Sequence, residues 1–158
     1  MQAQIYVAET PGDFERFRTL AEEYDRSLDA DLRHSDLHAE LSQLRATYQP
    51  PSAAFVAVRG ETPAGCVAIH RLDETTAVVK TMYVRPDFRK TGLGRALLSA
   101  ALDLARRRGF SRAVLDTQRD RLSAAYNLYR SIGFRECAPY RTVDYASPTY
   151  MELFLKTS

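Results

Sequence analysis

The sequence predicts one α/β domain whose strands and helices follow one another as β-αα-βββ-α-β-α-β. Apolar and β-branched runs at 53–58, 64–72 and 76–84 are separated by short polar turns, which favours an antiparallel meander. A helical apolar pattern over 92–108 then begins an alternation of helices and strands that reaches residue 155. A chain of 158 residues can build one full core and shows no linker-like stretch, so we expect a single domain over residues 1–158.

The elements outside the meander are predicted by their ends as well as by their apolar patterns. Residues 2–8 have the pattern of a strand, and Thr10-Pro11-Gly12-Asp13 has the N-cap, the proline and the first-turn acid of a helix start. That helix reaches Leu28, and a second helical pattern over 37–48 ends before Pro50-Pro51. The last elements expected are a strand at 113–117, a helix closed by Gly133, a loop at 139–148 and a strand at 149–155.

The bulk composition excludes several classes of protein. Hydrophobic residues make up 45% of the chain and charged residues 27%, as in ordinary globular domains. No apolar run approaches the roughly 20 residues that span a bilayer, and the first residues lack a signal-peptide pattern, so we expect no membrane association and a cytoplasmic location. Cys66 and Cys137 are too few for a disulfide framework or a zinc site, so we expect reduced thiols and no metal.

Charge is distributed unevenly along the chain. Residues 1–60 contain 6 Arg and 10 Asp or Glu, whereas residues 61–158 contain 16 Lys or Arg and 10 acids. A basic second part suits a polyanionic ligand. Nucleic acid is not expected as a partner, because the chain has no nucleic-acid-binding motif and no interleaving of basic and aromatic residues.

A strand, a glycine-bearing turn and a helix follow one another around residue 90. Pro86 ends the strand, and Gly92 and Gly94 let the backbone approach an anion without a Cβ in the way. The free N–H groups and the dipole of a helix N-terminus favour a phosphate, and four cationic side chains surround the same turn, those of Arg85, Arg89, Lys90 and Arg95. The stretch is neither a dinucleotide-binding fingerprint nor a P-loop, because it lacks the third glycine and the Gly-Lys-Ser/Thr of those motifs.

Two longer motifs make the interpretation of this turn more specific. The run Arg89-Lys90-Thr91-Gly92-Leu93-Gly94 fits the pattern Arg/Gln-x-x-Gly-x-Gly/Ala and follows Met82-Tyr83-Val84-Arg85-Pro86. About 40 residues later comes Leu128-Tyr129-Arg130-Ser131-Ile132-Gly133-Phe134. The chain thereby resembles the GNAT superfamily of N-acetyltransferases over residues 53 to 156, and over residues 1 to 50 in element order. The resemblance implies a central mixed, mostly antiparallel sheet with helices on both faces, and acetyl-CoA as cofactor.

The resemblance also assigns expected roles to residues. The backbone of Met82, Tyr83 and Val84 would pair with the pantetheine arm, at an edge that the family opens by splaying two parallel strands. The pyrophosphate would lie in a cradle made of Arg89, Lys90, Thr91, Gly92, Leu93, Gly94 and Arg95. Tyr129 would protonate the leaving thiolate.

Tyr129 also fits a purely structural role. It lies with Leu122, Ala125 and Ile132 on one helical stripe, so its ring can belong to the core. A tyrosine, with a reference pKa of about 10, is protonated at neutral pH and can serve as an acid. One ring can pack and still present its hydroxyl, and the motif favours the catalytic role.

The group that deprotonates the amine is left open. Many family members have a Glu five residues before the Tyr-Val pair, whereas this chain has Val78. His70, which shares a strand face with Cys66 and Ala68, is one candidate, and Asp116 at a strand end is another; ordered water is the third. Leu122 occupies a position where the family often has an Asn that contacts the cofactor arm.

The resemblance predicts transfer of an acetyl group to the amine of a small molecule or an exposed protein amine, with a homodimer possible. We expect the amine to contact polar groups that serve no evident core: Asp29, Asp31 and His34 in the acidic link, and Tyr140 in the stretch 140–145. The missing Glu favours an alternative, a non-catalytic module that senses acyl-CoA. Acetylation of an aminoacyl-tRNA is disfavoured, because the acidic N-terminal part would face the substrate.

Overall fold

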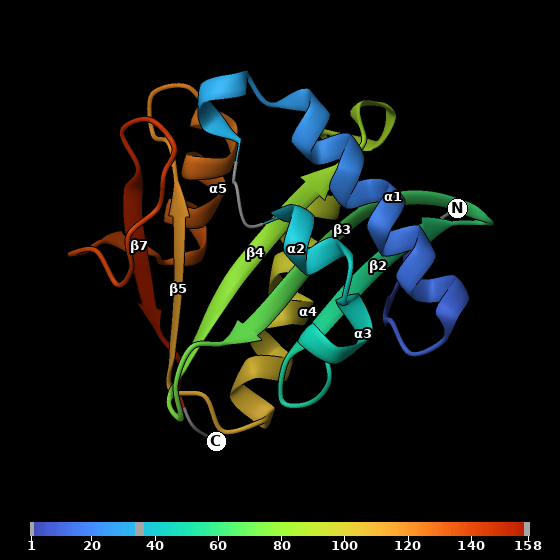
Figure 1. Cartoon of the computed structure of the whole chain (residues 1–158), viewed down its shortest axis with the longest axis horizontal. Coiled ribbons are helices and arrows are strands. Elements are labelled where there is room, and N and C mark those ends of the chain that lie inside the picture. The colour runs from blue at the N-terminus through green and yellow to red at the C-terminus, as the bar shows by residue number, and fades with distance from the viewer. Residues whose placement is uncertain (1, 34–36, 157–158) are drawn as a thin grey trace.

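A computed structural model describes residues 2–33 and 37–156 and contains a seven-stranded sheet in that part of the chain (Figure 1). The strands lie in the order β1 (Gln4–Val7), β2 (Ala53–Arg59), β3 (Thr62–Arg71), β4 (Thr76–Val84), β5 (Arg112–Thr117), β7 (Thr149–Phe154) and β6 (Arg135–Glu136). Every neighbouring pair is antiparallel except β4 and β5, which are parallel. The predicted mixed, mostly antiparallel sheet is therefore confirmed.

The helices cover both faces of this sheet. They are α1 (Pro11–Ser27), α2 (Leu37–Leu41), α3 (Leu44–Thr47), α4 (Leu93–Arg107) and α5 (Ser123–Ile132). Figure 1 shows α1, α2 and α3 in front of the sheet and α4 and α5 behind it. None of the described helices is long and apolar enough to cross a membrane.

One predicted element differs from the observed structure, and one observed strand was not predicted. The pattern over 37–48 forms two short helices instead of one, because the chain leaves helical geometry at Gln43, whose φ is −139°. Leu41 of the first helix and Leu44 of the second are both buried. The apolar pattern therefore continues across the break and cannot reveal it. The strand β6 was not predicted, since its two residues are too few to show an alternating pattern.

The start of α1 forms as its sequence predicts. The Thr10 hydroxyl accepts a hydrogen bond from the Asp13 N–H, and the Asp13 carboxylate accepts from the Thr10 N–H, so two N–H groups at the helix start are satisfied. Phe17, Leu20 and Ala21 are buried against the sheet. This packing fixes the position of the last turns of α1, which reach the candidate site.

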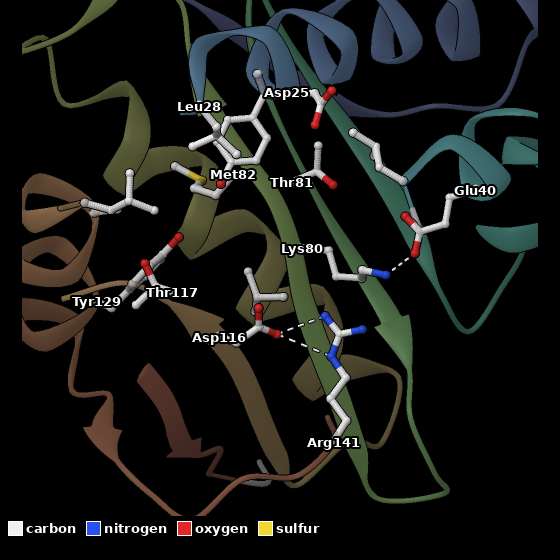
Figure 2. A pocket seen from close by; sticks show the side chains of 15 residues that line it. Asp25, Leu28, Glu40, Lys80, Thr81, Met82, Asp116, Thr117, Tyr129 and Arg141 are labelled. Carbon is white, nitrogen blue, oxygen red and sulfur yellow. Dashed lines mark hydrogen bonds and ion pairs between the residues drawn. The ribbon is translucent and has the colours of Figure 1, made fainter. Parts of the chain in front are cut away.

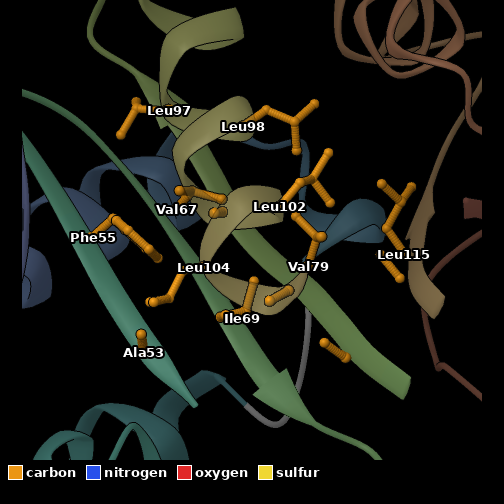
Figure 3. Packing of buried hydrophobic residues seen from close by; sticks show 14 of the residues in the cluster. Ala53, Phe55, Val67, Ile69, Val79, Leu97, Leu98, Leu102, Leu104 and Leu115 are labelled. Carbon is orange, nitrogen blue, oxygen red and sulfur yellow. The ribbon is translucent and has the colours of Figure 1, made fainter. Parts of the chain in front are cut away.

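The strands bury their two faces against different helices. Alternate residues of β2 show this directly, because Ala53 and Phe55 belong to the core under α4, whereas Ala54 and Val56 belong to the core under α1. Figure 3 shows α4 side chains such as Leu97 facing the strands. At Gly65 the helix approaches closely, since a Cβ there would lie 2.7 Å from the Tyr83 carbonyl oxygen and 3.0 Å from Leu97 Cδ1.

A β-bulge in β4 separates it from β5. The register between β3 and β4 shifts between Cys66 and Ala68, and Thr81 adopts a left-handed backbone with a φ of 56°. Pairing between β4 and β5 covers only Thr76 to Val78 on β4, so the two strands diverge beyond that point (Figure 1). A positive φ at a β-branched residue is unfavourable, and such strain is concentrated at functional sites.

Candidate active site

The divergence of β4 from β5 leaves one edge of β4 open. The Arg85 N–H donates to the Ala64 carbonyl on β3, so the neighbouring backbone groups of Val84 point to the opposite, open edge. Arg89 Nε donates to the Val84 carbonyl at 2.9 Å and occupies one acceptor there. The rest of the open edge can pair with an extended ligand that carries amide groups.

The turn before α4 has the geometry of an anion site. Lys90 and Gly92 both have positive φ, 63° and 85°, as in turns whose backbone N–H groups form an anion-binding concavity. Gly92 is the N-cap of α4, and no side chain caps this helix end, which leaves its first-turn N–H groups to a ligand. The Thr91 hydroxyl donates to the Phe88 carbonyl at 2.5 Å and thereby holds the turn closed.

The glycine at position 94 serves close packing. A Cβ at Gly94 would lie 3.3 Å from Met82 Cε and 3.4 Å from Leu128 Cδ2. Gly94 therefore lies where β4, α4 and α5 meet. At Gly92, by contrast, a Cβ would meet no atom within 4 Å, and the positive φ is what favours glycine there.

Two residues predicted to lie at the cofactor have other partners, namely Tyr83, expected at the pantetheine arm, and Arg85, expected among the cations of the turn. Arg85 forms an ion pair with Glu23 of α1 and donates from its Nη1 to the Pro63 carbonyl. Tyr83 faces the core under α1, where its hydroxyl donates to Glu23 at 3.3 Å, and its backbone lies in the paired register with Cys66. The backbone groups of Tyr83 face β3 and not the open edge, because successive residues of a strand direct their backbone groups to opposite sides. Arg95 remains near the turn and donates to the Ser131 hydroxyl.

A cavity of about 90 Å³ lies in the opening between β4 and β5 (Figure 2). It is lined by residues of five elements and one loop: Tyr24, Asp25 and Leu28 at the end of α1, Leu37 and Glu40 of α2, Val79 to Met82 of β4, Asp116 and Thr117 of β5, Leu122, Ala125 and Tyr129 at α5, and Arg141. The cavity begins where the pairing of the two strands ends.

Tyr129 is placed between the core and this cavity. Its ring packs edge-to-face on Phe134 with centroids 5.9 Å apart, and only 6% of the residue is exposed. The structure gives its hydroxyl no hydrogen-bond partner among residues 2–33 and 37–156, although the side chain lines the cavity. Burial raises the pKa of Tyr129 well above its usual value, and nearby Tyr24 and Asp116 add to the effect, so the hydroxyl keeps its proton.

Asp116 is the centre of a buried hydrogen-bond network. Its side chain is 3% exposed and accepts from the hydroxyls of Tyr140 and Tyr145 at 2.5 and 2.7 Å and from Arg141 Nη2 at 2.9 Å. Burial alone would raise the pKa of Asp116, but these donors outweigh it and hold the pKa below its ordinary value. The carboxylate therefore stays ionised and fixes the loop that carries Tyr140 and Arg141.

The other predicted substrate residues are placed as follows. The exposed Asp31 and Asp29 carboxylates bind Arg121, and neither residue lines the cavity. His70 packs edge-to-face on Tyr48, and burial, followed by the charge of Lys80, lowers its pKa, so it is neutral at pH 7. It does not line the cavity either. His34 lies outside the described residues.

The link that contains Asp29 and Asp31 and the loop at 139–148, both predicted to contact the substrate, are in contact with each other. The Ala146 N–H donates to the Asp31 carbonyl at 2.9 Å, and Tyr145 packs with Leu28 and Leu32 in a small apolar cluster. Three charged cavity residues were not singled out from the sequence as site residues, namely Asp25, Glu40 and Lys80. Each lies beside an apolar stripe, and only the folded chain shows that they face one another.

Comparisons of sequence and of structure with known proteins all find similarity to acetyltransferases. The model of the acetyltransferase (GNAT) family matches residues 14–134. An uncharacterized N-acetyltransferase of Schizosaccharomyces pombe is 33% identical over 152 residues, which cover 94% of this chain and 93% of that protein. A GNAT-family acetyltransferase from Staphylococcus aureus Mu50 superposes with a TM-score of 0.80 at 20% identity, over 98% of this chain and 100% of the other.

A further solved structure bears on the ligand. The yncA acetyltransferase of Salmonella typhimurium, determined with its cofactor acetyl-CoA, has a TM-score of 0.75 at 23% identity and covers 100% of this chain and 96% of its own. The open edge of β4 and the uncapped turn before α4 fit an extended ligand that carries amides and a pyrophosphate.

Proposed function

Because the chain belongs to the acetyltransferase (GNAT) family, its acetyl donor is acetyl-CoA, and we propose that it transfers the acetyl group to a primary amine in a ternary complex. The observation that carries this proposal is the hydroxyl of the buried residue Tyr129, which keeps its proton and has no hydrogen-bond partner in the described structure. It faces a cavity that opens directly beside the free edge of β4.

The residues that would hold the cofactor follow from the geometry of that edge. The backbone of Met82 and Val84 would pair with the pantetheine arm, and the N–H groups at the start of α4 would bind the pyrophosphate. Lys90 and Arg95 would contribute charge around the turn. When bound, the cofactor supplies a thioester that is already activated toward an amine.

Tyr129 would act as the acid for the leaving sulfur. Its high pKa keeps the proton in place over the physiological range, and the packing on Phe134 fixes the ring. The apolar lining of the cavity, which includes Leu28 and Leu122, would limit access of water to the reacting groups.

Proton removal from the amine would use the cavity side of the site. Val78 is 4% exposed, pairs with Val114 and does not line the cavity, so position 78 is remote from the amine in this chain. Asp25, Glu40 and Asp116 are the carboxylates that line the cavity in the described structure, and a water held by them would provide a path to solvent.

Thiol release from acetyl-CoA tests the proposal, with a panel of alkylamines, amino acids and peptides that carry a free N-terminus or a lysine. We expect amine-dependent release well above the hydrolysis measured without amine, together with the acetylated product in a mass spectrum. If acetyl-CoA binds tightly and no member of the panel is acetylated, amine acetylation is wrong for this chain and the sensor alternative is favoured.

A further inference from the structure

The charged side chains of the cavity do not cancel one another. Its described lining contains three carboxylates, those of Asp25, Glu40 and Asp116, and two cations, Lys80 and Arg141. Lys80 is paired with Glu40, and Arg141 with Asp116. One negative charge is left over, and it belongs to Asp25.

Asp25 is not paired with any cation in the part of the chain that the structure describes. No hydrogen bond or ion pair joins its carboxylate to any other residue within 2–33 and 37–156. Figure 2 shows it at the end of the cavity formed by α1, away from the pair of Asp116 and Arg141. Asp25 is partly buried and lines the cavity together with Leu28 and Met82, so its carboxylate is available to a cation that enters the cavity.

The position of Asp25 is fixed by the packing of α1. The same helix buries Ala21 one turn earlier, and the ring of Tyr24 lies 5.8 Å from that of Tyr83 on β4. Asp25 therefore projects from a well-anchored turn into the opening between β4 and β5. It lies on the same cavity as Tyr129, the proposed acid.

We propose that Asp25 binds the ammonium group of the substrate, and that this substrate is an unbranched alkylammonium compound without a carboxylate beside the amine. The inference rests on the proposed function and specifies its acceptor. A substrate carboxylate would have to compete with Glu40 or Asp116 for the two cations, which are already engaged. The ammonium meets the uncompensated charge of Asp25, and Leu28, Leu37 and Leu122 provide apolar surface for methylene groups.

The small size of the cavity supports the same class. About 90 Å³ corresponds to roughly three water molecules at about 30 Å³ each, enough for an aminomethyl group and a short carbon chain. A free alkylamine and the side chain of a lysine share this chemistry. Turnover of n-butylamine alone would indicate the first source, and turnover of an N-terminally blocked lysine peptide alone would indicate the second.

The test compares Asp25→Asn, which keeps the shape of the side chain, with Glu22→Gln as a matched control. Glu22 lies on the same helix, loses the same charge on substitution and does not line the cavity. Binding of n-butylamine to the protein saturated with coenzyme A is measured by NMR titration, and kcat and KM are measured with acetyl-CoA. We expect Asp25→Asn to weaken amine binding and to raise the amine KM about tenfold to a hundredfold, since a hydrogen bond between charged groups is lost. Acetyl-CoA affinity should stay unchanged in both variants.

The substrate class is tested separately with norvaline, which adds a carboxylate to the amine-bearing carbon of n-butylamine. We expect wild-type protein to bind n-butylamine at least about tenfold more tightly than norvaline. Tighter binding of norvaline would overturn the substrate class, and wild-type amine binding in Asp25→Asn would overturn the role of Asp25.

Two controls separate a failure of the Asp25 assignment from misfolding of the variant and from failure of the proposed function. If Asp25→Asn melts far below wild type, Asp25→Ser is measured instead, and loss of both amine and acetyl-CoA binding in both variants overturns the assignment in favour of a structural role. If wild-type protein turns over no amine, the proposed function fails, whereas the binding titration still decides whether Asp25 recognises an ammonium ion.

Discussion

The cofactor turn and the acceptor cavity are built in opposite ways. The turn uses consecutive residues from Arg89 to Arg95, and its chemistry is supplied mainly by backbone N–H groups. The cavity takes side chains from positions as distant as Tyr24 and Arg141, and its chemistry is supplied by charges and hydroxyls. If the proposed roles of the two regions hold, the ligand common to the family is bound by a local motif, whereas the ligand particular to this protein is met by side chains that only the fold brings together.

The largest expected effect tests the turn. Gly94→Glu should reduce acetyl-CoA binding below detection, because the new side chain must displace Met82 or Leu128 and places a negative charge beside the helix start. Gly94→Ala adds only the Cβ, and we expect it to weaken binding much less. Calorimetry gives the affinity and thermal melting checks the fold. Wild-type affinity in folded Gly94→Glu protein would show that the cofactor does not use this turn.

The second effect tests Tyr129, which lines the cavity and is proposed to protonate the sulfur of the cofactor. Tyr129→Phe should lower kcat about 100-fold, the usual size of a general-acid contribution, and leave acetyl-CoA affinity unchanged. Stability should change by no more than about 1 kcal/mol, since the hydroxyl has no hydrogen bond to lose within the described structure. Tyr126→Phe is the control, because Tyr126 lies on the same helix and its hydroxyl donates to Glu136. A folded Tyr129→Phe enzyme with wild-type kcat would leave Tyr129 a core residue only.

The third effect tests the cavity through its buried carboxylate. Asp116→Asn should destabilise the protein by about 2–3 kcal/mol at pH 7, because it weakens hydrogen bonds to a charged group and leaves the Arg141 cation uncompensated. Asp103→Asn removes a half-exposed partner of Arg106 and Arg107 on α4 and should cost much less.

The stability difference between wild type and Asp116→Asn should depend on pH in one direction. The pKa of Asp116 is lower in the folded protein than its ordinary value of 3.8, so its stabilising contribution is complete above that value. It is lost as the pH falls below 3.8 through the folded pKa. The difference in unfolding free energy between wild type and Asp116→Asn should therefore be constant from pH 8 to about 5 and shrink below about 4. A difference that shrinks already near neutral pH would contradict an ionised Asp116.

The smallest effect concerns the acidic link. Asp31→Ala should leave the amine KM within about twofold of wild type, because the carboxylate is exposed, binds Arg121 and does not line the cavity. Steady-state kinetics with the accepted amine provide the measurement. A tenfold rise in KM would instead place the acidic link in the acceptor site, as the sequence had predicted.

The motifs predicted the class of protein and the fold well because they are local. The strand up to Val84, the glycine turn and the amphipathic helix after it are each specified by neighbouring residues, and the same holds for the capping box at Thr10 and Asp13. The capping box could be read from spacing alone. The same local logic misassigned Arg85, since proximity in sequence to the turn does not reveal that its side chain binds Glu23.

The acceptor side could be predicted only in part. The sequence pointed to Tyr140 and to the late loop, and the structure places Tyr140 against Asp116. It offered no reason to select Asp25 among ten acids in the first 60 residues, because the distinguishing property is the lack of a partner among the residues that the structure describes. Partners across the chain, such as Lys80 and Glu40, are separated by 40 positions and become neighbours only through the packing of α2 on β4.

The sequence by itself determined the family, the order of most elements and the place of the glycine turn before α4, because each depends on hydrogen bonds and apolar periods within about 15 residues of chain. Only the tertiary structure decided how far β4 and β5 stay paired and which charges meet in the gap between them. The bulge at Thr81 and the separation of the two strands beyond Val78 are properties of a register between strands. A register is set by the competition of all the strands and helices for one core, which no single stretch of sequence contains.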